Sequence, residues 1–150
     1  MALLAVGLMM NAQNFSIKAK SGDIELDASL EDINIKAKAD IKLFKTDLSL
    51  EFNIGEDKID NMLNIQMSPA DIYMTVQVAN LVNKDVEIVK EAYVKNQGKG
   101  WGQIAKEMGI KPGSPEFHAL KGKAKGKKDK GEKGNGKGNG KGHGKGHGKK

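Results

Sequence analysis

The chain has 150 residues, 38% of them hydrophobic and none of them cysteine. This suffices for one modest core and excludes disulfides, thiolate metal sites and cysteine nucleophiles. Residues 1–120 carry 13 lysines and 17 acidic residues, a net charge of −4, whereas residues 121–150 carry 12 lysines and two acidic residues, a net charge of +10. The chain has no arginine, so it lacks the planar group that holds guanine or phosphate through two hydrogen bonds at once. Any anion would be bound by the point charges of lysines.

Residues 1–13 contain an apolar run, residues 2–10, followed by small and polar residues. This order is typical of the hydrophobic and cleavage regions of a secretory signal peptide that ends near Ala12 or Gln13, although no basic residue precedes the run. The alternative is an apolar N-terminus or a first strand. The run is too short to span a bilayer. We therefore expect an exported protein, either periplasmic, cell-surface or secreted, whose globular domain covers residues 14–121.

Residues 14–30 alternate between apolar and polar side chains around a Ser21-Gly22 pair. The apolar positions are Phe15, Ile17, Ala19, Ile24, Leu26, Ala28 and Leu30. A period of two on both sides of a turn signal predicts a β-hairpin with one buried face. An isolated hairpin is only marginally stable, so we expect it to pack on the rest of the domain.

Residues 32–121 favour helices. The apolar residues between 33 and 52 fit both strand and helix spacing, but only the helical register continues through residues 44–46, and Asn53 suits a left-handed helix end. Further helices are predicted behind Glu56 and Asp57, at the capping box formed by Ser68, Pro69 and Asp71 with proline at the first helical position, and through Val86, Val89 and Tyr93. The expected fold class is mainly α (α+β): an N-terminal β-hairpin, a compact bundle of about five short helices, and a disordered tail over residues 122–150.

The stretch GKGWGQIAKEMGIKPGSPEFHALK, residues 98–121, is dense in structural signals. Trp101, Ile104, Ala105 and Met108 fall on one face of a short helix that Gly109 ends and Pro112 forbids from continuing. A last helix is predicted to start at Ser114 and Pro115 and to bury Phe117 and Leu120. We interpret the stretch as the end of a folded domain.

The segment GWGQIAKEMGI also resembles the first helix and turn of helix-turn-helix domains. Together with the basic tail, this makes a cytoplasmic DNA-binding regulator the alternative hypothesis. The segment after the turn offers only Glu116, His118 and Lys121 as exposed polar candidates, and the expected domain is net acidic. We therefore place DNA recognition second to export.

The candidate catalytic and metal residues are few. Gly98-Lys99-Gly100 lacks the spacing of a Walker loop, so Lys99 is at most a weak anion contact. Ser114 precedes His118 by four residues but is needed as a helix cap. Other candidates are carboxylates for a loosely bound Ca²⁺ (Asp23, Glu25, Asp27, Glu31 and Asp32) and two imidazoles for a transition metal (His143 and His147). We expect a solvated strand face and solvated tail histidines, and hence no enzyme, no cofactor and no specific metal site.

Residues 98–121 resemble a signature of a group of small bacterial proteins that are predicted to be exported and have no known function. The shared features are GKGWG at 98–102, IAK at 104–106, GIKPGS at 109–114 and EFHALK at 116–121. SPADIYM at 68–74, FKTDLS at 44–49 and the Lys/Gly-rich C-terminus are similar to the same group, so the resemblance covers most of residues 31–121. It implies export but no activity.

Residues 122–150 alternate glycine with lysine, asparagine and histidine, and such a segment cannot offset the entropy of ordering by burial. We predict a non-enzymatic protein that binds polyanions non-specifically: acidic cell-surface polysaccharide, extracellular nucleic acid or anionic lipid. The expected anion-binding residues are Lys99, Lys121, Lys123, Lys125, Lys127, Lys128, Lys130, Lys133, Lys137, Lys141, Lys145, Lys149 and Lys150. The oligomeric state is left open.

Overall fold

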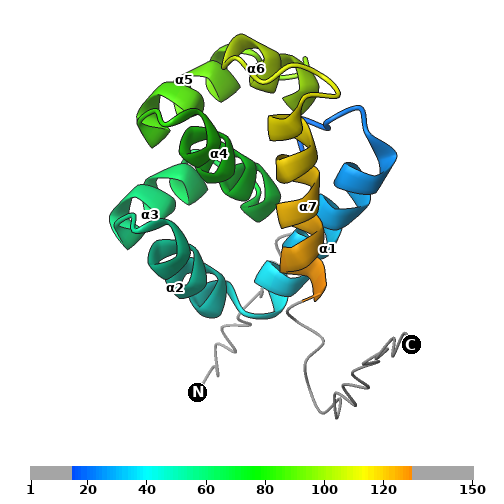
Figure 1. Ribbon diagram of the computed structural model, residues 1–150. Coiled ribbons are helices and arrows are strands. Elements are labelled where there is room, and N and C mark those ends of the chain that lie inside the picture. The colour runs from blue at the N-terminus through cyan, green and yellow to red at the C-terminus, as the bar shows by residue number, and fades with distance from the viewer. Residues whose placement is uncertain (1–14, 130–150) are drawn as a thin grey trace, which may run out of the picture.

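The computed structural model describes residues 15–129, and within them every regular element is a helix (Figure 1). The helices are α1 (Ile24–Ala39), α2 (Ile41–Phe52), α3 (Glu56–Asn64), α4 (Pro69–Val82), α5 (Val86–Lys95), α6 (Trp101–Glu107) and α7 (Pro115–Asp129). Residues 15–22, which precede α1, form no helix or strand, and we call them the N-terminal strap. None of the helices in this part of the chain is long and apolar enough to cross a membrane.

Helix α4 is the centre of the bundle. Residues 69–79 are all buried, and the helix contacts α1, α2, α3, α5 and α7, which surround it in Figure 1. A helix buried on every side is expected to be apolar all round, and α4 largely is. The exceptions are Asp71, Thr75 and Gln77, three polar residues that lie in the core.

Several predicted helix boundaries are confirmed. Asn53 ends α2 in the left-handed conformation, with φ of 51°. Ser68 caps α4 by accepting a 3.1 Å hydrogen bond from the backbone N–H of Asp71, and Pro69 is the first helical residue. Gly109 ends α6 with φ of 96°, and the Ser114 hydroxyl accepts from the N–H of Phe117 at the start of α7.

The predicted β-hairpin over residues 14–30 is wrong, and with it the α+β class, because residues 24–39 form helix α1. Asp23 caps this helix by accepting a 2.9 Å hydrogen bond from Leu26 N–H. The buried side chains of α1 recur every three or four residues, whereas Ile24, which the alternating pattern would bury, is 88% exposed. The alternation of apolar and polar residues over 24–30 is therefore a coincidence within a helical repeat.

Residues 33–52 are helical, as the sequence analysis favoured over strands, but they belong to two helices. Asp40 separates α1 from α2 and caps α2 by accepting a 2.9 Å hydrogen bond from Leu43 N–H. The structure thus has seven helices in residues 15–129, where about five were predicted.

Helix α7 extends beyond the predicted end of the domain at residue 121. Ala124 is fully buried, and the Lys127 ammonium lies 2.8 Å from the Glu51 carboxylate of α2. Residues 122–129 are therefore part of the folded body, contrary to the predicted boundary of the tail. The rest of the predicted tail, residues 130–150, and the predicted signal peptide lie outside the described residues.

Candidate functional site

Asp71 lies in the first turn of α4 and is fully buried. One carboxylate oxygen accepts hydrogen bonds from the Ser68 hydroxyl (2.8 Å), the Lys18 backbone N–H (3.1 Å) and the Tyr93 hydroxyl (3.2 Å). The other accepts from the indole N–H of Trp101 at 2.8 Å. A buried carboxylate is costly unless its oxygens are hydrogen-bonded, so this arrangement ties the strap, α5 and α6 to the start of α4.

Trp101 and Tyr93 stack on each other beside this carboxylate, with ring centroids 5.6 Å apart and planes at 25°. Burial, and then the negative charge of Asp71, raise the pKa of Tyr93, so its hydroxyl stays protonated and remains a donor. Both rings are inaccessible to solvent. The structural role predicted for Trp101 is confirmed, and its ring is not available to a ligand.

Two glycines of the GKGWG motif allow the strap to approach the start of α6. The N–H of Trp101 donates a 2.6 Å hydrogen bond to the carbonyl of Lys20. A Cβ atom at Gly100 would lie 2.5 Å from that same carbonyl oxygen, and one at Gly102 would lie 2.7 Å from the carbonyl oxygen of Ser21. The loop before α6 is therefore shaped to receive the backbone of the strap.

Along the strap, side chains alternate between the core and solvent. Ile17 and Ala19 are buried, whereas Lys18 and Lys20 are exposed. The alternation seen in the sequence was thus real for these residues, although it does not belong to a strand. It places Lys18 and Lys20 on the outer side of the strap.

A hollow of about 420 Å³ lies between the strap and residues 98–103. Lys18, Lys20 and Lys99 line it, and none of its described lining residues is acidic. All three lysines are exposed, and none forms an ion pair with a carboxylate of residues 15–129. We call this feature the lysine hollow. It contains Lys99, which was predicted as an anion contact, and Lys18 and Lys20, which were not.

Two of the predicted anion-binding lysines of the C-terminal part are engaged within the protein. Lys121 lies 2.8 Å from Asp23 and 3.3 Å from Glu25, and Lys127 pairs with Glu51. The hydrogen bond from Lys121 holds the pKa of Asp23 below its usual value, and Asp23 in turn raises the pKa of Lys121. An external anion would have to compete with these carboxylates.

Of the other predicted C-terminal lysines, the structure describes the side chains of only Lys123 and Lys125. Lys123 and Lys125 are exposed on α7 and make no ion pair with the acidic residues of the described part. The side chain of Lys128 is not described. The remaining predicted contacts and the two tail imidazoles lie beyond residue 129: Lys130, Lys133, Lys137, Lys141, Lys145, Lys149, Lys150, His143 and His147.

A second hollow, of about 440 Å³, lies between α1 and α7 and includes His118, Lys121 and Glu25. His118 is exposed, and the Ser114 hydroxyl already accepts the 3.2 Å capping hydrogen bond from Phe117. Lys121 and Glu25 form an ion pair with each other. This arrangement gives no support to a nucleophile activated by His118.

The carboxylates considered for Ca²⁺ lie on α1 and at its start instead of on a strand. Asp23 caps the helix and pairs with Lys121, and Asp27 accepts 2.7 Å hydrogen bonds from the backbone N–H and the hydroxyl of Ser21. No three histidines or carboxylates are grouped to hold a metal ion anywhere in residues 15–129.

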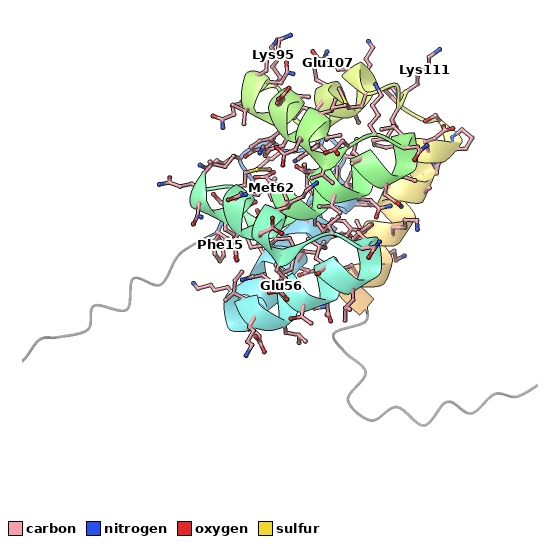
Figure 2. All side chains as sticks on the ribbon, turned by 90° about the vertical axis from the view of Figure 1, so that its left-hand side faces the viewer. Phe15, Glu56, Met62, Lys95, Glu107 and Lys111 are labelled. Atoms are coloured by element: carbon pink, nitrogen blue, oxygen red, sulfur yellow. The ribbon has the colours of Figure 1, made fainter. Side chains whose placement is uncertain are left out.

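The positions of α6 and α7 do not favour the helix-turn-helix hypothesis. Helix α7 packs along α1 and also against α4, whereas α6 packs against α5. Figure 2 shows the charged side chains of Lys95, Glu107 and Lys111 projecting at the α6 end of the molecule, where Asn96 of the α5 end donates to Glu107. The inner face of α7 is buried through Leu120 and Ala124, and Lys121 is ion-paired.

Comparison of the chain with family models, curated proteins and solved structures gave no match. The resemblance of residues 98–121 to a group of exported bacterial proteins therefore stays a prediction.

Proposed function

We propose that the protein is exported, has no enzymatic activity and binds polyanions non-specifically through lysines of its C-terminal part. The observation that carries this proposal is the distribution of charge. Residues 15–129 contain 18 lysines and 18 acidic residues, whereas residues 130–150 contain seven lysines and one acidic residue. A segment with a net charge of +6 beside a neutral body attracts polymeric anions by point charges, with little discrimination among them.

The course of α7 supports this arrangement. The helix starts beside α6 and ends at the opposite end of the molecule, near the α1–α2 junction (Figure 1). Lys123 and Lys125 extend the cationic segment back onto the body, whereas Lys121 and Lys127 are left out of the proposal because they are ion-paired. The partners considered are acidic polysaccharide, extracellular nucleic acid and anionic lipid.

Duplex DNA is a convenient polyanion for the test. If about six lysines meet phosphates, the logarithm of the association constant falls with the logarithm of salt concentration at a slope of about −5. Replacing the seven lysines of residues 130–150 by glutamine should reduce the slope to about −2 or less in magnitude, the share left to Lys123 and Lys125, while the matched replacement by arginine should preserve it. Equal binding by the glutamine and arginine variants would contradict the proposal.

The export part of the proposal has its own test. Mass spectrometry of the native protein should find a mature chain that begins near Gln13 or Asn14. A mature chain that retains residues 1–13 would contradict export and return attention to a cytoplasmic role.

A further inference from the structure

We propose that the lysine hollow binds a compact oxyanion, a phosphate or sulfate group, through the ammonium groups of Lys18, Lys20 and Lys99. This site lies on the folded body and is separate from the C-terminal lysines of the proposed function. Its volume of about 420 Å³ is within the range of small-ligand sites and exceeds what one such group requires. The site would therefore accept the group either free or as part of a larger molecule.

The charge of the hollow is unusual for this protein. Several other lysines of the body pair with nearby carboxylates; examples are Lys45 with Asp60, Lys90 with Glu87 and Lys121 with Asp23. The hollow of similar volume between α1 and α7 is lined by Glu25 as well as by lysines. Three lysines and no acidic residue are among the described lining of the lysine hollow, so a ligand of two or more negative charges would balance its charge.

The backbone that carries these lysines is held from inside the protein. The N–H of Lys18 donates to the buried Asp71 carboxylate, and the carbonyl of Lys20 accepts from Trp101 N–H. Ala19, between them, is 1% exposed, which fixes the neighbouring lysines on the outer side. Because the backbone positions are set before a ligand arrives, binding has to order only the lysine side chains.

The site also depends on the contact between strap and loop. Two of its lysines come from the strap and the third comes from the loop before α6, and the contact at Gly100 and Gly102 holds the two segments together. A change that separates the strap from the loop should abolish the site even when all three lysines are retained. This distinguishes a built site from three unrelated surface charges.

Titration of the full-length, isotope-labelled protein with inorganic phosphate, at constant ionic strength set by chloride, tests the proposal by nuclear magnetic resonance. We expect saturable shifts of backbone amides in residues 17–22 and 98–103. Replacing Lys18, Lys20 and Lys99 together by glutamine should raise the dissociation constant at least about tenfold, because each exposed charge contact contributes roughly a few-fold. The control variant, with Lys42, Lys84 and Lys111 replaced by glutamine, has the same net charge and should bind within about twofold of the original chain.

The Gly102→Ala variant tests the dependence on the strap, since its added Cβ would meet the Ser21 carbonyl oxygen at 2.7 Å. It should lose phosphate shifts as the triple-lysine variant does, whereas Gly122→Ala, whose Cβ would meet nothing within 4 Å, should keep them. Phosphate binding by Gly102→Ala equal to that by Gly122→Ala would overturn the dependence on the strap.

The source of the oxyanion is tested with vesicles of phosphatidylcholine with and without phosphatidic acid. Vesicle binding that is lost in the triple-lysine variant supports a lipid-borne phosphate, and vesicle binding unaffected by that variant, alongside shifts with inorganic phosphate, supports a free one. Phosphate shifts confined to residues 130–150, or equal binding by the two triple variants, would overturn the site. The glutamine variant of residues 130–150 separates this result from the proposed function, because it should lose DNA binding and keep the shifts at the hollow.

Discussion

The indole N–H of Trp101 donates a 2.8 Å hydrogen bond to the buried carboxylate of Asp71, which lies 30 residues earlier in the chain. Because the same carboxylate accepts from the backbone of Lys18, the start of α6 and the strap are fixed to one group at the N-terminus of α4. The tryptophan of the GKGWG motif thus satisfies a buried charge, and its two flanking glycines admit the strap. The motif is explained by this contact without a ligand on the tryptophan.

Replacing Trp101 by phenylalanine should lower the free energy of unfolding by about 2–4 kcal/mol. A lost hydrogen bond to a charged acceptor contributes about 1.5–3 kcal/mol, and the smaller ring leaves a cavity in the core. Urea unfolding followed by far-ultraviolet circular dichroism measures the change. Tyr93→Phe should cost about half as much, because the carboxylate oxygen that accepts from Tyr93 keeps the Lys18 N–H and the Ser68 hydroxyl as donors and the aromatic ring is retained. A Trp101→Phe variant as stable as the original chain would contradict the role assigned to the carboxylate.

Gly102→Ala and Gly122→Ala form a matched pair for stability. Alanine favours a helix by about 1 kcal/mol over glycine, so Gly122→Ala on the exposed side of α7 should stabilise the protein by up to that amount. Gly102→Ala should destabilise it in spite of this preference, because the strap must move away from the added Cβ. Thermal unfolding of both variants gives the comparison, and stabilisation by Gly102→Ala would show that the strap accommodates the methyl group easily.

The features that could be predicted from the sequence are those determined within one or two helical turns. Ser68, Asn53 and Gly109 act at the ends of the helices to which they belong, so their residue types and neighbours are sufficient evidence. The sequence pattern that predicts the apolar side of α6 is equally local, and Trp101 and Ile104 are buried as predicted.

The features that sequence reasoning missed depend on contacts between distant residues. The alternation of residues 24–30 fits a strand, whereas the packing of α1 against α4 and α7, together with the cap at Asp23, favours the helix. The sequence predicts Asp71 only as a member of a capping box, because the donors Lys18 and Trp101 lie far from it in the chain. The sequence did not predict that Lys18 and Lys20 lie beside the same hollow as Lys99, because they are about 80 residues apart in the chain. The alternation of the strap did predict that Lys18 and Lys20 lie on the same side.

Both tyrosines of the chain are fully buried, which predicts an abrupt response to alkaline pH. Burial raises the pKa of Tyr73 and Tyr93 well above the usual range, and the charges of Glu51 and Asp71 respectively add to the effect. The unfolded chain ionises these groups near pH 10, so their contribution to stability is complete below that pH and is lost as the pH rises above it. The loss is about 1.4 kcal/mol per pH unit for each tyrosine.

Phenolate absorbance should therefore appear together with unfolding and not before it. A spectrophotometric titration run in parallel with circular dichroism checks the coincidence, and the same titration in urea should show ionisation near pH 10. Phenolate absorbance in a chain that is still folded at pH 10 would contradict the burial of these side chains.

Lys121→Gln tests the ion pair between α7 and the start of α1. The pKa of Asp23 should rise toward its ordinary value of 3.8, although the hydrogen bond from Leu26 N–H still holds it down in part. Because the pKa of Asp23 is lowered in the folded state, its contribution to stability is present above the ordinary value and is lost as the pH falls through the lowered one. Carbon-detected titration of the Asp23 carboxyl measures the shift, and Lys123→Gln, at an exposed lysine of the same helix, should leave it unchanged.

Gln77, unlike the residues above, has a side chain that is expected to destabilise the folded protein. It is fully buried in α4, and neither its Nε2 nor its Oε1 has a hydrogen-bond partner among residues 15–129. Burying an unpaired amide costs about 1–3 kcal/mol, so Gln77→Met, which keeps the length of the side chain and removes the polar atoms, should raise the free energy of unfolding by a similar amount. Gln103→Met, at an exposed position, should change it by less than about 0.5 kcal/mol. A Gln77→Met variant that is less stable than the original chain would contradict the expected cost of the buried amide.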